Sequence, residues 1–159
     1  MNADEIAKGL SPFQPEKVAI EAGRIMLNRI RELIDMSEDF AFETTLSTRS
    51  YIHTVKKAQE KGYNVVLLFF WLQRVELAIE RVKERVKEGG HNIPTQVIKR
   101  RYKKGIYNLF ELYLPVIDSV LIFDNSEGKH ELIAEKIEGN QLTLLNQEKF
   151  IRLKKYYEF

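Results

Sequence analysis

The chain has 159 residues, 44% of them hydrophobic and 30% charged, which is typical of a globular protein of one domain. Its 25 basic and 23 acidic residues leave a net charge of +2, too small to give a general field for binding nucleic acid or an anionic membrane. It contains no cysteine, which excludes disulfides, thiolate metal sites and a cysteine nucleophile.

The first 62 residues predict a helix, a strand and a second helix. Apolar residues at helical spacing predict an amphipathic helix over residues 15–36, with Pro15 near its first turn. Residues 40–44 are aromatic and apolar, which predicts a short strand. Residues 49–62 predict a helix that glycine closes.

The middle of the chain contains the clearest strand, residues 64–72, with the sequence NVVLLFFWL. Such a continuous apolar run is typical of a parallel strand covered on both faces by helices. Two predicted helices, over residues 76–88 and 94–113, flank a GGHNIP loop. Residues 119–124 (SVLIFD) predict another apolar strand, which ends in a polar turn.

The last predicted element is a small β-hairpin at about residues 129–146, where two alternating segments surround Gly139. Because strands alternate with helices, we expect an α/β fold, a three-layer sandwich with a mostly parallel sheet, formed by one domain over residues 1–159. The N-terminus lacks a targeting pattern, and the longest apolar run, residues 65–72, is far below the roughly 20 residues that span a bilayer. We therefore expect a cytoplasmic chain without membrane contact.

Polar residues follow two of the predicted strands. Glu43 and Thr45 come at the end of one strand, and residues 124–126 at the end of another. Ligands of open α/β sheets bind beyond the carboxyl ends of the strands, so these residues should face one crevice, which Asp4 could join. Each carboxylate has a structural alternative: Glu43 as a strand-end group in solvent, and Asp4 as the N-cap of the segment EIAKGL.

Basic residues surround the two glycines of the GGHNIP loop, and arginine forks suit phosphate oxygens. They predict a phosphate-binding lid. The alternative is a solvated helix whose glutamates and arginines pair at i,i+4 spacing. The three histidines lack the spacing of a metal site, so no protein-ligated metal is predicted. The basic residues are Arg74, Arg81, Arg85, His91, Arg100, Arg101, Lys103 and Lys104.

Taken in order, several segments resemble the zeta-toxin-like predicted ATPases of bacteria. The resemblance covers nearly the whole chain and depends most on GGHNIP followed by IKRRYKKG, with NADEIAKGLSPF, FAFETTLSTRSY, KGYNVVLLFFWL and FDNSEGKHELIAE. It implies the fold of P-loop kinases, in which a GxxxxGK[ST] loop between the first strand and the first helix holds ATP with Mg²⁺. It also implies a reaction, because characterised zeta toxins phosphorylate UDP-N-acetylglucosamine.

The resemblance implies roles for residues of the acceptor side. Asp4 falls where the family has the carboxylate that accepts the proton of the attacking hydroxyl. Glu43 and Thr45 fall on the strand-end motif that binds the substrate, and Arg49 follows that motif and is assigned to the same site.

A second group is implied to contact ATP. Arg81 matches an arginine that contacts the ATP phosphates, and Arg100 or Arg101 stands where related kinases have lid arginines. His91 stands where characterised toxins have a second phosphate-binding arginine, which is a departure from the family pattern. Asn125 is assigned to the same ATP group.

The family pattern begins before the first residues of this sequence. Members place a strand, the glycine-rich loop, a helix and a second strand ahead of the NADEIA segment, which here starts at Asn2. We therefore expect a domain incomplete at its N-terminus, truncated before the Walker A loop and without the first strand. Because that loop supplies most of the phosphate positioning, we expect no kinase turnover from this chain alone.

The leading hypothesis is thus a zeta-toxin-like, ATP-dependent small-molecule kinase that is inactive by itself. Its expected ligands are a nucleotide and a small-molecule substrate, and its expected partner is an antitoxin or a second copy of the chain. The alternative is a non-catalytic binding or regulatory module that pairs with a protein through an open sheet edge. A third hypothesis is a different enzyme that uses Asp4 and Glu43 as paired acids.

Overall fold

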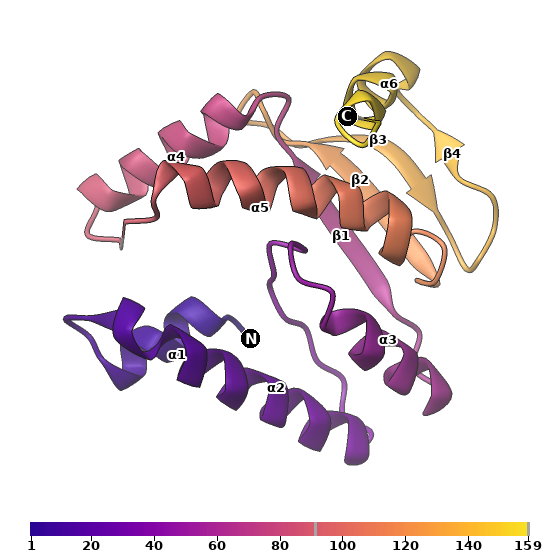
Figure 1. The fold of residues 1–159 in the computed structure, drawn as a ribbon. Helices are drawn as coiled ribbons and strands as arrows, with labels where there is room; N and C mark the ends of the chain where they lie inside the picture. The colour runs from indigo at the N-terminus through magenta and orange to yellow at the C-terminus, as the bar shows by residue number, and fades with distance from the viewer. Residues whose placement is uncertain (91, 159) are drawn as a thin grey trace. The chain divides into compact units, whose positions relative to one another are not determined.

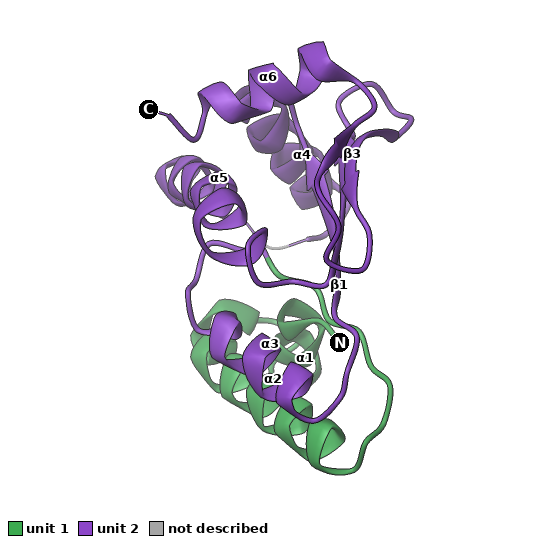
Figure 2. Ribbon diagram, turned by 90° about the vertical axis from the view of Figure 1, so that its right-hand side faces the viewer, with its two compact units in different colours: residues 1–44 green, residues 45–159 purple. Residues whose placement is uncertain are grey.

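The computed structural model describes residues 1–90 and 92–158 (Figure 1). The chain divides into two compact units, Met1–Thr44 and Thr45–Phe159, coloured separately in Figure 2. Each unit is described by itself below. Among the described residues, no helix combines the length and the apolar character that a bilayer crossing needs.

The first unit is helical. It contains α1 (Ala3–Leu10), a 3₁₀ turn (Pro15–Val18) and α2 (Ala19–Asp35), which together confirm the helix predicted over residues 15–36. Helix α2 packs on α1. One stripe of α2 is buried, because its apolar residues recur every four positions on one helical face; these residues are Ala22, Met26, Ile30 and Ile34.

The segment over residues 40–44 forms no strand, so this prediction is wrong for the structure. The ammonium group of Met1 donates to Ala41 O at 2.5 Å, and the Glu43 amide donates to Met1 O at 2.9 Å. These two bonds resemble a single step of parallel pairing. No strand forms over residues 40–44 all the same, so aromatic composition by itself does not decide strand formation here.

The second unit contains one sheet of four strands in the order β1-β2-β3-β4. The strands are β1 (Val66–Trp71), β2 (Ser119–Asp124), β3 (Glu131–Lys136) and β4 (Thr143–Leu144). The first two confirm the apolar strands predicted from the sequence. Strands β3 and β4 pair antiparallel across the turn around Gly139.

The prediction of a mostly parallel sheet holds for β1 and β2 but not for the rest of the sheet. Strands β1 and β2 are parallel over their full length, from Val66 opposite Ser119 to Trp71 opposite Asp124. Strand β3 runs antiparallel to β2. Residues 125–130, which connect them, are too few for the crossover that a parallel neighbour needs, since that takes about a dozen residues or more.

Four helices complete the second unit: α3 (Tyr51–Glu60), α4 (Val75–Lys87), α5 (Thr95–Asn108) and α6 (Gln147–Lys155). Helix α5 continues as a π-helical turn over Leu109–Tyr113, which confirms the long helix predicted before Pro115. Helix α6 is absent from the sequence prediction. Its signals are the N-cap Asn146, whose side chain accepts from the Lys149 amide, and the buried pair Phe150 and Leu153.

The core of the second unit lies on one face of the sheet, where α5 and α6 both sit in Figure 2. Trp71 of β1, Ile122 of β2 and Ile133 of β3 are buried on or near it. On the other face of β1, Val66, Leu68 and Phe70 are 54%, 53% and 50% exposed. This face of β1 therefore lacks the full cover that a three-layer sandwich predicts.

The loop over residues 45–50 is anchored on α5 and its extension. The buried Asn108 side chain donates to Leu46 O at 2.8 Å, and the Tyr113 hydroxyl donates to Thr48 O at 3.2 Å. Leu46 is buried with φ at 56°, the left-handed region that side chains rarely adopt, so these bonds hold a strained backbone. A Cβ on Gly105 would lie 2.8 Å from Thr45 O, so the loop approaches α5 where only glycine leaves room.

The contact at Gly105 reverses the usual effect of a glycine substitution. Alanine in place of a helical glycine normally raises the free energy of unfolding by up to about 1 kcal/mol. Because the new methyl group would overlap the Thr45 carbonyl, we expect Gly105→Ala to lower it by roughly 1–3 kcal/mol. Urea unfolding followed by circular dichroism measures the change.

The matched control is Gly23→Ala in α2, where a Cβ meets no atom within 4 Å. This variant should show the usual stabilisation. If Gly105→Ala were stabilised as much as Gly23→Ala, the close packing of the 45–50 loop on α5 would be wrong.

Candidate functional site

Strands β1 and β2 end side by side, because Trp71 lies opposite Asp124 in their parallel register. Hydrogen bonds donated by backbone amides hold together the two chain segments that follow these strands. The Asn125 amide donates to Trp71 O at 2.8 Å, and the Gln73 amide donates to the Ser126 hydroxyl at 2.9 Å. The polar loop over residues 124–126 is therefore fixed at the carboxyl edge of the parallel pair, where ligands of α/β sheets bind.

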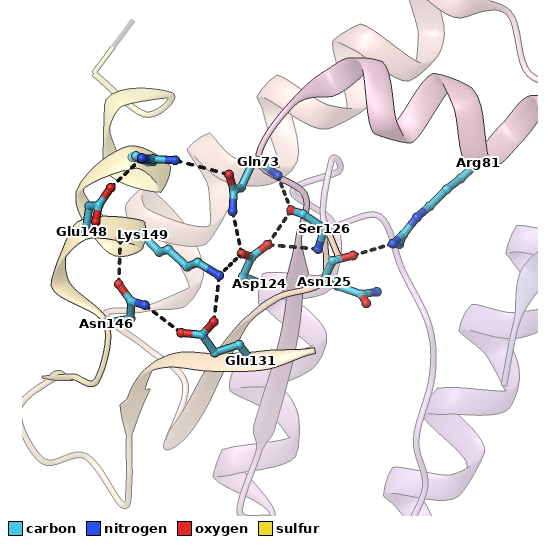
Figure 3. Close-up of polar contacts among 10 residues, drawn as sticks. Gln73, Arg81, Asp124, Asn125, Ser126, Glu131, Asn146, Glu148 and Lys149 are labelled. Atoms are coloured by element: carbon cyan, nitrogen blue, oxygen red, sulfur yellow. Dashed lines mark hydrogen bonds and ion pairs between the residues drawn. The ribbon is translucent and has the colours of Figure 1, made fainter. Parts of the chain in front are cut away.

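Asp124 organises this loop (Figure 3). Its side chain is only 2% exposed, yet its oxygens have several partners. They accept from the Gln73 side-chain amide at 2.7 Å and from the Ser126 amide at 3.0 Å and hydroxyl, and they pair with Lys149 Nζ at 2.7 Å. The buried carboxylate is thus satisfied on both oxygens, as burial of a charge requires.

Lys149 brings α6 to this loop. Its ammonium group lies 2.7 Å from Asp124 and 2.7 Å from Glu131 at the start of β3, and Asn146 donates to the other Glu131 oxygen at 2.7 Å. Burial raises the pKa of Asp124, but Lys149, Ser126 and Gln73 outweigh it and hold that pKa below its usual value. The bonds to Asp124 and Glu131 raise the pKa of Lys149.

The structure brings two predicted ATP-binding residues together. The Arg81 guanidinium of α4 donates to Asn125 O at 2.5 Å, as Figure 3 shows. Arg81 is exposed and Asn125 is half-buried. Since the carbonyl takes one of five guanidinium N–H groups, the others stay available to an anion. No ion pair joins side chains within α4 in the part of the chain described, so the interpretation of this helix as a row of i,i+4 salt bridges is wrong.

The other predicted residues of the second unit have no direct bond to this pair. Arg100 is exposed and Arg101 half-buried on α5, and within residues 92–158 no hydrogen bond or ion pair joins either to Asn125. Thr45 shares a hydroxyl hydrogen bond of 2.9 Å with Ser47, and Arg49 is exposed on the anchored loop. His91 lies outside the described residues.

The Asn2 side chain bonds to both predicted acceptor residues of the first unit, to Asp4 through its backbone amide and to Glu43 through its carboxylate. Its Oδ1 accepts from the Asp4 amide at 2.8 Å, and its Nδ2 donates to Glu43 Oε2 at 2.8 Å. Asn2 is therefore the N-cap of α1, and the interpretation of Asp4 as that cap is wrong. Asp4 lies in the first helical turn with its carboxyl group exposed, and Glu43 is exposed as well. Sequence reasoning misses Asn2, although a cap residue two positions ahead of Asp4 is a visible signal.

Several features a complete Mg–ATP site needs are not supplied by the residues described. Within residues 1–90 and 92–158, one turn leads from a parallel strand into a helix, Leu72 to Arg74 between β1 and α4, and it contains no glycine to form a phosphate-binding nest. No group of three His, Asp or Glu side chains within the described chain could hold a metal ion. Arg81 and Asn125 suit the phosphates of a nucleotide. The described residues supply neither the glycine nest nor the metal ligands that the rest of a Mg–ATP site needs.

The fold and these polar loops define a mixed α/β protein with a candidate site beside Arg81 in one unit and, in the other, an asparagine that bonds Glu43 and the Asp4 amide. The chain belongs to the zeta toxin family, whose sequence profile matches residues 3–138. This finding confirms the resemblance drawn from the sequence.

Two further comparisons agree with the family. An uncharacterized protein of Haemophilus influenzae is 37% identical over 102 residues, which cover 64% of this chain and 73% of that protein. A solved structure from a study of the PezAT chromosomal toxin-antitoxin system of Streptococcus pneumoniae superposes with a TM-score of 0.60 and 13% identity. The match covers 99% of this chain and 73% of the other. At this identity the likeness shows a shared fold.

The stability of the second unit depends on the Lys149 ammonium group, because it pairs with the buried Asp124 carboxylate. Lys149→Met should lower the free energy of unfolding by roughly 1–3 kcal/mol, because Asp124 would stay buried without an ion-pair partner. We expect less than for a fully enclosed pair because Lys149 keeps 21% of its side chain exposed. Glu131→Gln removes the exposed partner of the same lysine and should have a much smaller effect. Equal effects of the two variants in urea unfolding would contradict the central position of Asp124.

The lowered pKa of Asp124 predicts that the free energy of unfolding depends on pH. The pKa of Asp124 is lowered in the folded chain, so its contribution is complete above its usual pKa of 3.8 and is lost as the pH falls through the lowered value. The free energy of unfolding should therefore decrease on acidification below about pH 4. Lys149→Met should show a shallower decrease, since it removes one cause of the lowered pKa. Parallel slopes for the two proteins would contradict this assignment.

Proposed function

We propose that this chain supplies the acceptor site and the nucleotide-facing arginines of a zeta-toxin-like, ATP-dependent kinase that phosphorylates a UDP-N-acetylamino sugar. The observation that carries the proposal is the Asn2 bridge, in which one side chain bonds both the Glu43 carboxylate and the backbone amide of Asp4, the two residues that the family resemblance assigns to acceptor chemistry. It supports a prearranged acceptor site in the first unit. The family match over residues 3–138 supports the proposed reaction class.

The acceptor residues have distinct proposed tasks. Asp4 accepts the proton of the attacking sugar hydroxyl, since its exposed carboxyl group has no hydrogen-bond partner among the described residues. Glu43 binds and orients the acceptor with the oxygen that Asn2 does not occupy. The family resemblance assigns Thr45 and Arg49, on the loop of the second unit that is anchored on α5, to substrate binding as well. Asn2 fixes Glu43 so that less ordering is needed when the acceptor binds.

The nucleotide residues are proposed as a second group. Arg81, held against the Asn125 carbonyl, contacts the phosphates of ATP with its remaining N–H groups. Arg100 or Arg101 on α5, and His91, would supply positive charge to the phosphates of a bound nucleotide. Mg²⁺ and ATP are the proposed cofactors. A protein antitoxin is the proposed partner, because the structural neighbour comes from a toxin-antitoxin system.

The 159 residues contain no GxxxxGK[ST] sequence. We therefore propose that this chain by itself does not turn over ATP, because the backbone nest, lysine and magnesium-binding hydroxyl of that loop supply most of the catalytic positioning in P-loop kinases.

The acceptor assignment predicts nucleotide-sugar binding that depends on Glu43. In calorimetric titration, UDP-N-acetylglucosamine should bind the chain, and Glu43→Gln should weaken binding by about tenfold, or roughly 1.4 kcal/mol. Glu21→Gln removes the same charge from an exposed position of α2 and should leave the affinity unchanged. The acceptor assignment fails if the sugar nucleotide does not bind or if both variants behave alike.

Titration of Mg–ATP tests the nucleotide side separately. The 159-residue chain should show no binding in the micromolar range. If it does bind in that range and Arg81→Ala abolishes the binding, a GxxxxGK[ST] loop is not essential for nucleotide affinity. Transfer of phosphate to the sugar nucleotide by this chain would overturn the proposed inactivity.

One observation favours a second candidate function, a protein-binding module. Strand β1 is the first in the sheet order, and its residues Val66, Leu68 and Phe70 are about half exposed. An open apolar strand of this kind is a site of strand addition by a partner. Oligomers whose size rises with concentration, measured by light scattering in a chain that binds neither nucleotide, would favour this function over the kinase.

A further inference from the structure

A pocket of about 390 Å³ lies in the second unit, lined by the turn before α4 and by the end of α6. Gln73 and Arg74 come from the turn between β1 and α4, and Arg152, Lys155 and Tyr156 come from the end of α6. The volume is within the range of about 300–1,000 Å³ that small-molecule sites occupy and exceeds what one phosphate ion fills. None of these residues belongs to the nucleotide or acceptor groups proposed above.

The lining has an excess of positive charge. Three of its residues are cations and none is an acid. Arg74 and Lys155 form no hydrogen bond or ion pair through their side chains in the described part of the chain. Arg74 is also the N-cap residue of α4, and no side chain caps that helix, so its partial positive end adds to the field. An anion in the pocket would relieve this unbalanced charge.

Acidic neighbours balance only part of this charge. Glu148 pairs with Arg152 at 2.5 Å, and the same guanidinium reaches Gln73 Oε1 at 3.5 Å. Glu76 lies in the first turn of α4, beyond the pocket lining. Arg152 keeps further N–H groups for a ligand, since one carboxylate and one amide oxygen do not use all five.

The apolar side of the pocket is held in place by aromatic contacts. The Tyr156 hydroxyl donates to Gln73 O at 2.9 Å. Its ring packs edge to face on Tyr102, with centroids 5.5 Å apart, and on Trp71, with centroids 6.5 Å apart. The Tyr102 hydroxyl in turn donates to Leu72 O at 2.6 Å. The Tyr156 ring is therefore held in position at the edge of the pocket before any ligand binds.

We propose that this pocket binds a small organic phosphate. Arg74, Arg152 and Lys155 hold the phosphate group, because guanidinium forks and an ammonium group suit its oxygens. The uncharged part of the ligand packs against Tyr156. Gln73 connects the bound ligand to the loop after β2, because its side chain donates to Asp124 and its backbone amide donates to the Ser126 hydroxyl. The ligand thereby stabilises the loop that presents Asn125 to Arg81.

The test uses uridine 5′-monophosphate as the probe, with uridine and inorganic phosphate in parallel. Trp71 is the single tryptophan of the chain and contacts Tyr156, so its fluorescence reports on the pocket, and calorimetry gives the affinity. We expect saturable binding of the monophosphate, weaker binding of inorganic phosphate and none of uridine. No saturable binding of the monophosphate, or equal binding of inorganic phosphate, would overturn the proposal.

Matched variants separate this pocket from general attraction to a basic helix. The double variant Arg74→Ala with Lys155→Ala should weaken binding of the monophosphate at least about tenfold. Lys154→Ala removes one charge from α6 outside the lining and should change it less than about twofold. Glu148→Gln should strengthen binding, because it frees Arg152. A loss for Lys154→Ala as large as for the double variant would overturn the assignment.

Arg81→Ala distinguishes this site from the proposed nucleotide edge. It removes a residue of that edge that does not line the pocket. Binding of uridine 5′-monophosphate should therefore persist in this variant within about twofold. If Arg81→Ala abolished it, the monophosphate would be bound at the proposed nucleotide edge, and the pocket assignment would be wrong while the kinase proposal stood.

Discussion

The carboxylate of Asp124 is the group on which the polar edge of the second unit depends. A charge that is 2% exposed is stable only if every oxygen is paired, and the structure pairs this one through three separate segments of chain. Gln73 comes from the turn after β1, Ser126 from the loop after β2, and Lys149 from α6. Satisfying one buried charge therefore fixes the position of three elements relative to each other.

This requirement explains why the loop after β2 makes so many hydrogen bonds although it is short and polar. Its backbone bonds to Trp71 and Gln73 supplement the bonds to Asp124. Asn125 is then presented by a fixed backbone, and Arg81 has a defined acceptor on which to rest. A site that must bind an anion gains from such prior ordering, because less conformational entropy is lost on binding.

Local sequence patterns are sufficient to predict those helices and strands that are marked by the spacing of their own apolar residues. The helix of residues 15–36 and the strands at residues 64–72 and 119–124 follow from apolar spacing and continuous apolar runs. Residues 40–44 have the composition of a strand but form none in the structure, so strand propensity alone does not determine this segment. The family, and with it Arg81 and Asn125 as candidates, came from ordered segments that no single periodicity contains.

Contacts between distant residues could not be predicted in this way. Lys149 reaches Asp124 only after a hairpin and the start of α6 have folded back, and Asn2 reaches Glu43 across the whole of α2. Neither pairing leaves a spacing pattern, because lysine and asparagine are ordinary surface residues by composition. The pocket at the end of α6 was missed for the same reason, since α6 itself was not predicted.

The half-exposed face of β1 has a consequence for how the chain folds. The segment VLLFFW has no charge, glycine or proline, which is the composition of sequences that stack into cross-β aggregates. Its parallel partner β2 lies some fifty residues later in the chain. The segment therefore stays unpaired until this slow, long-range pairing step is complete. Folding yield should therefore be limited by self-association of this hexapeptide, and dilution or rapid capture by a chaperone would protect it.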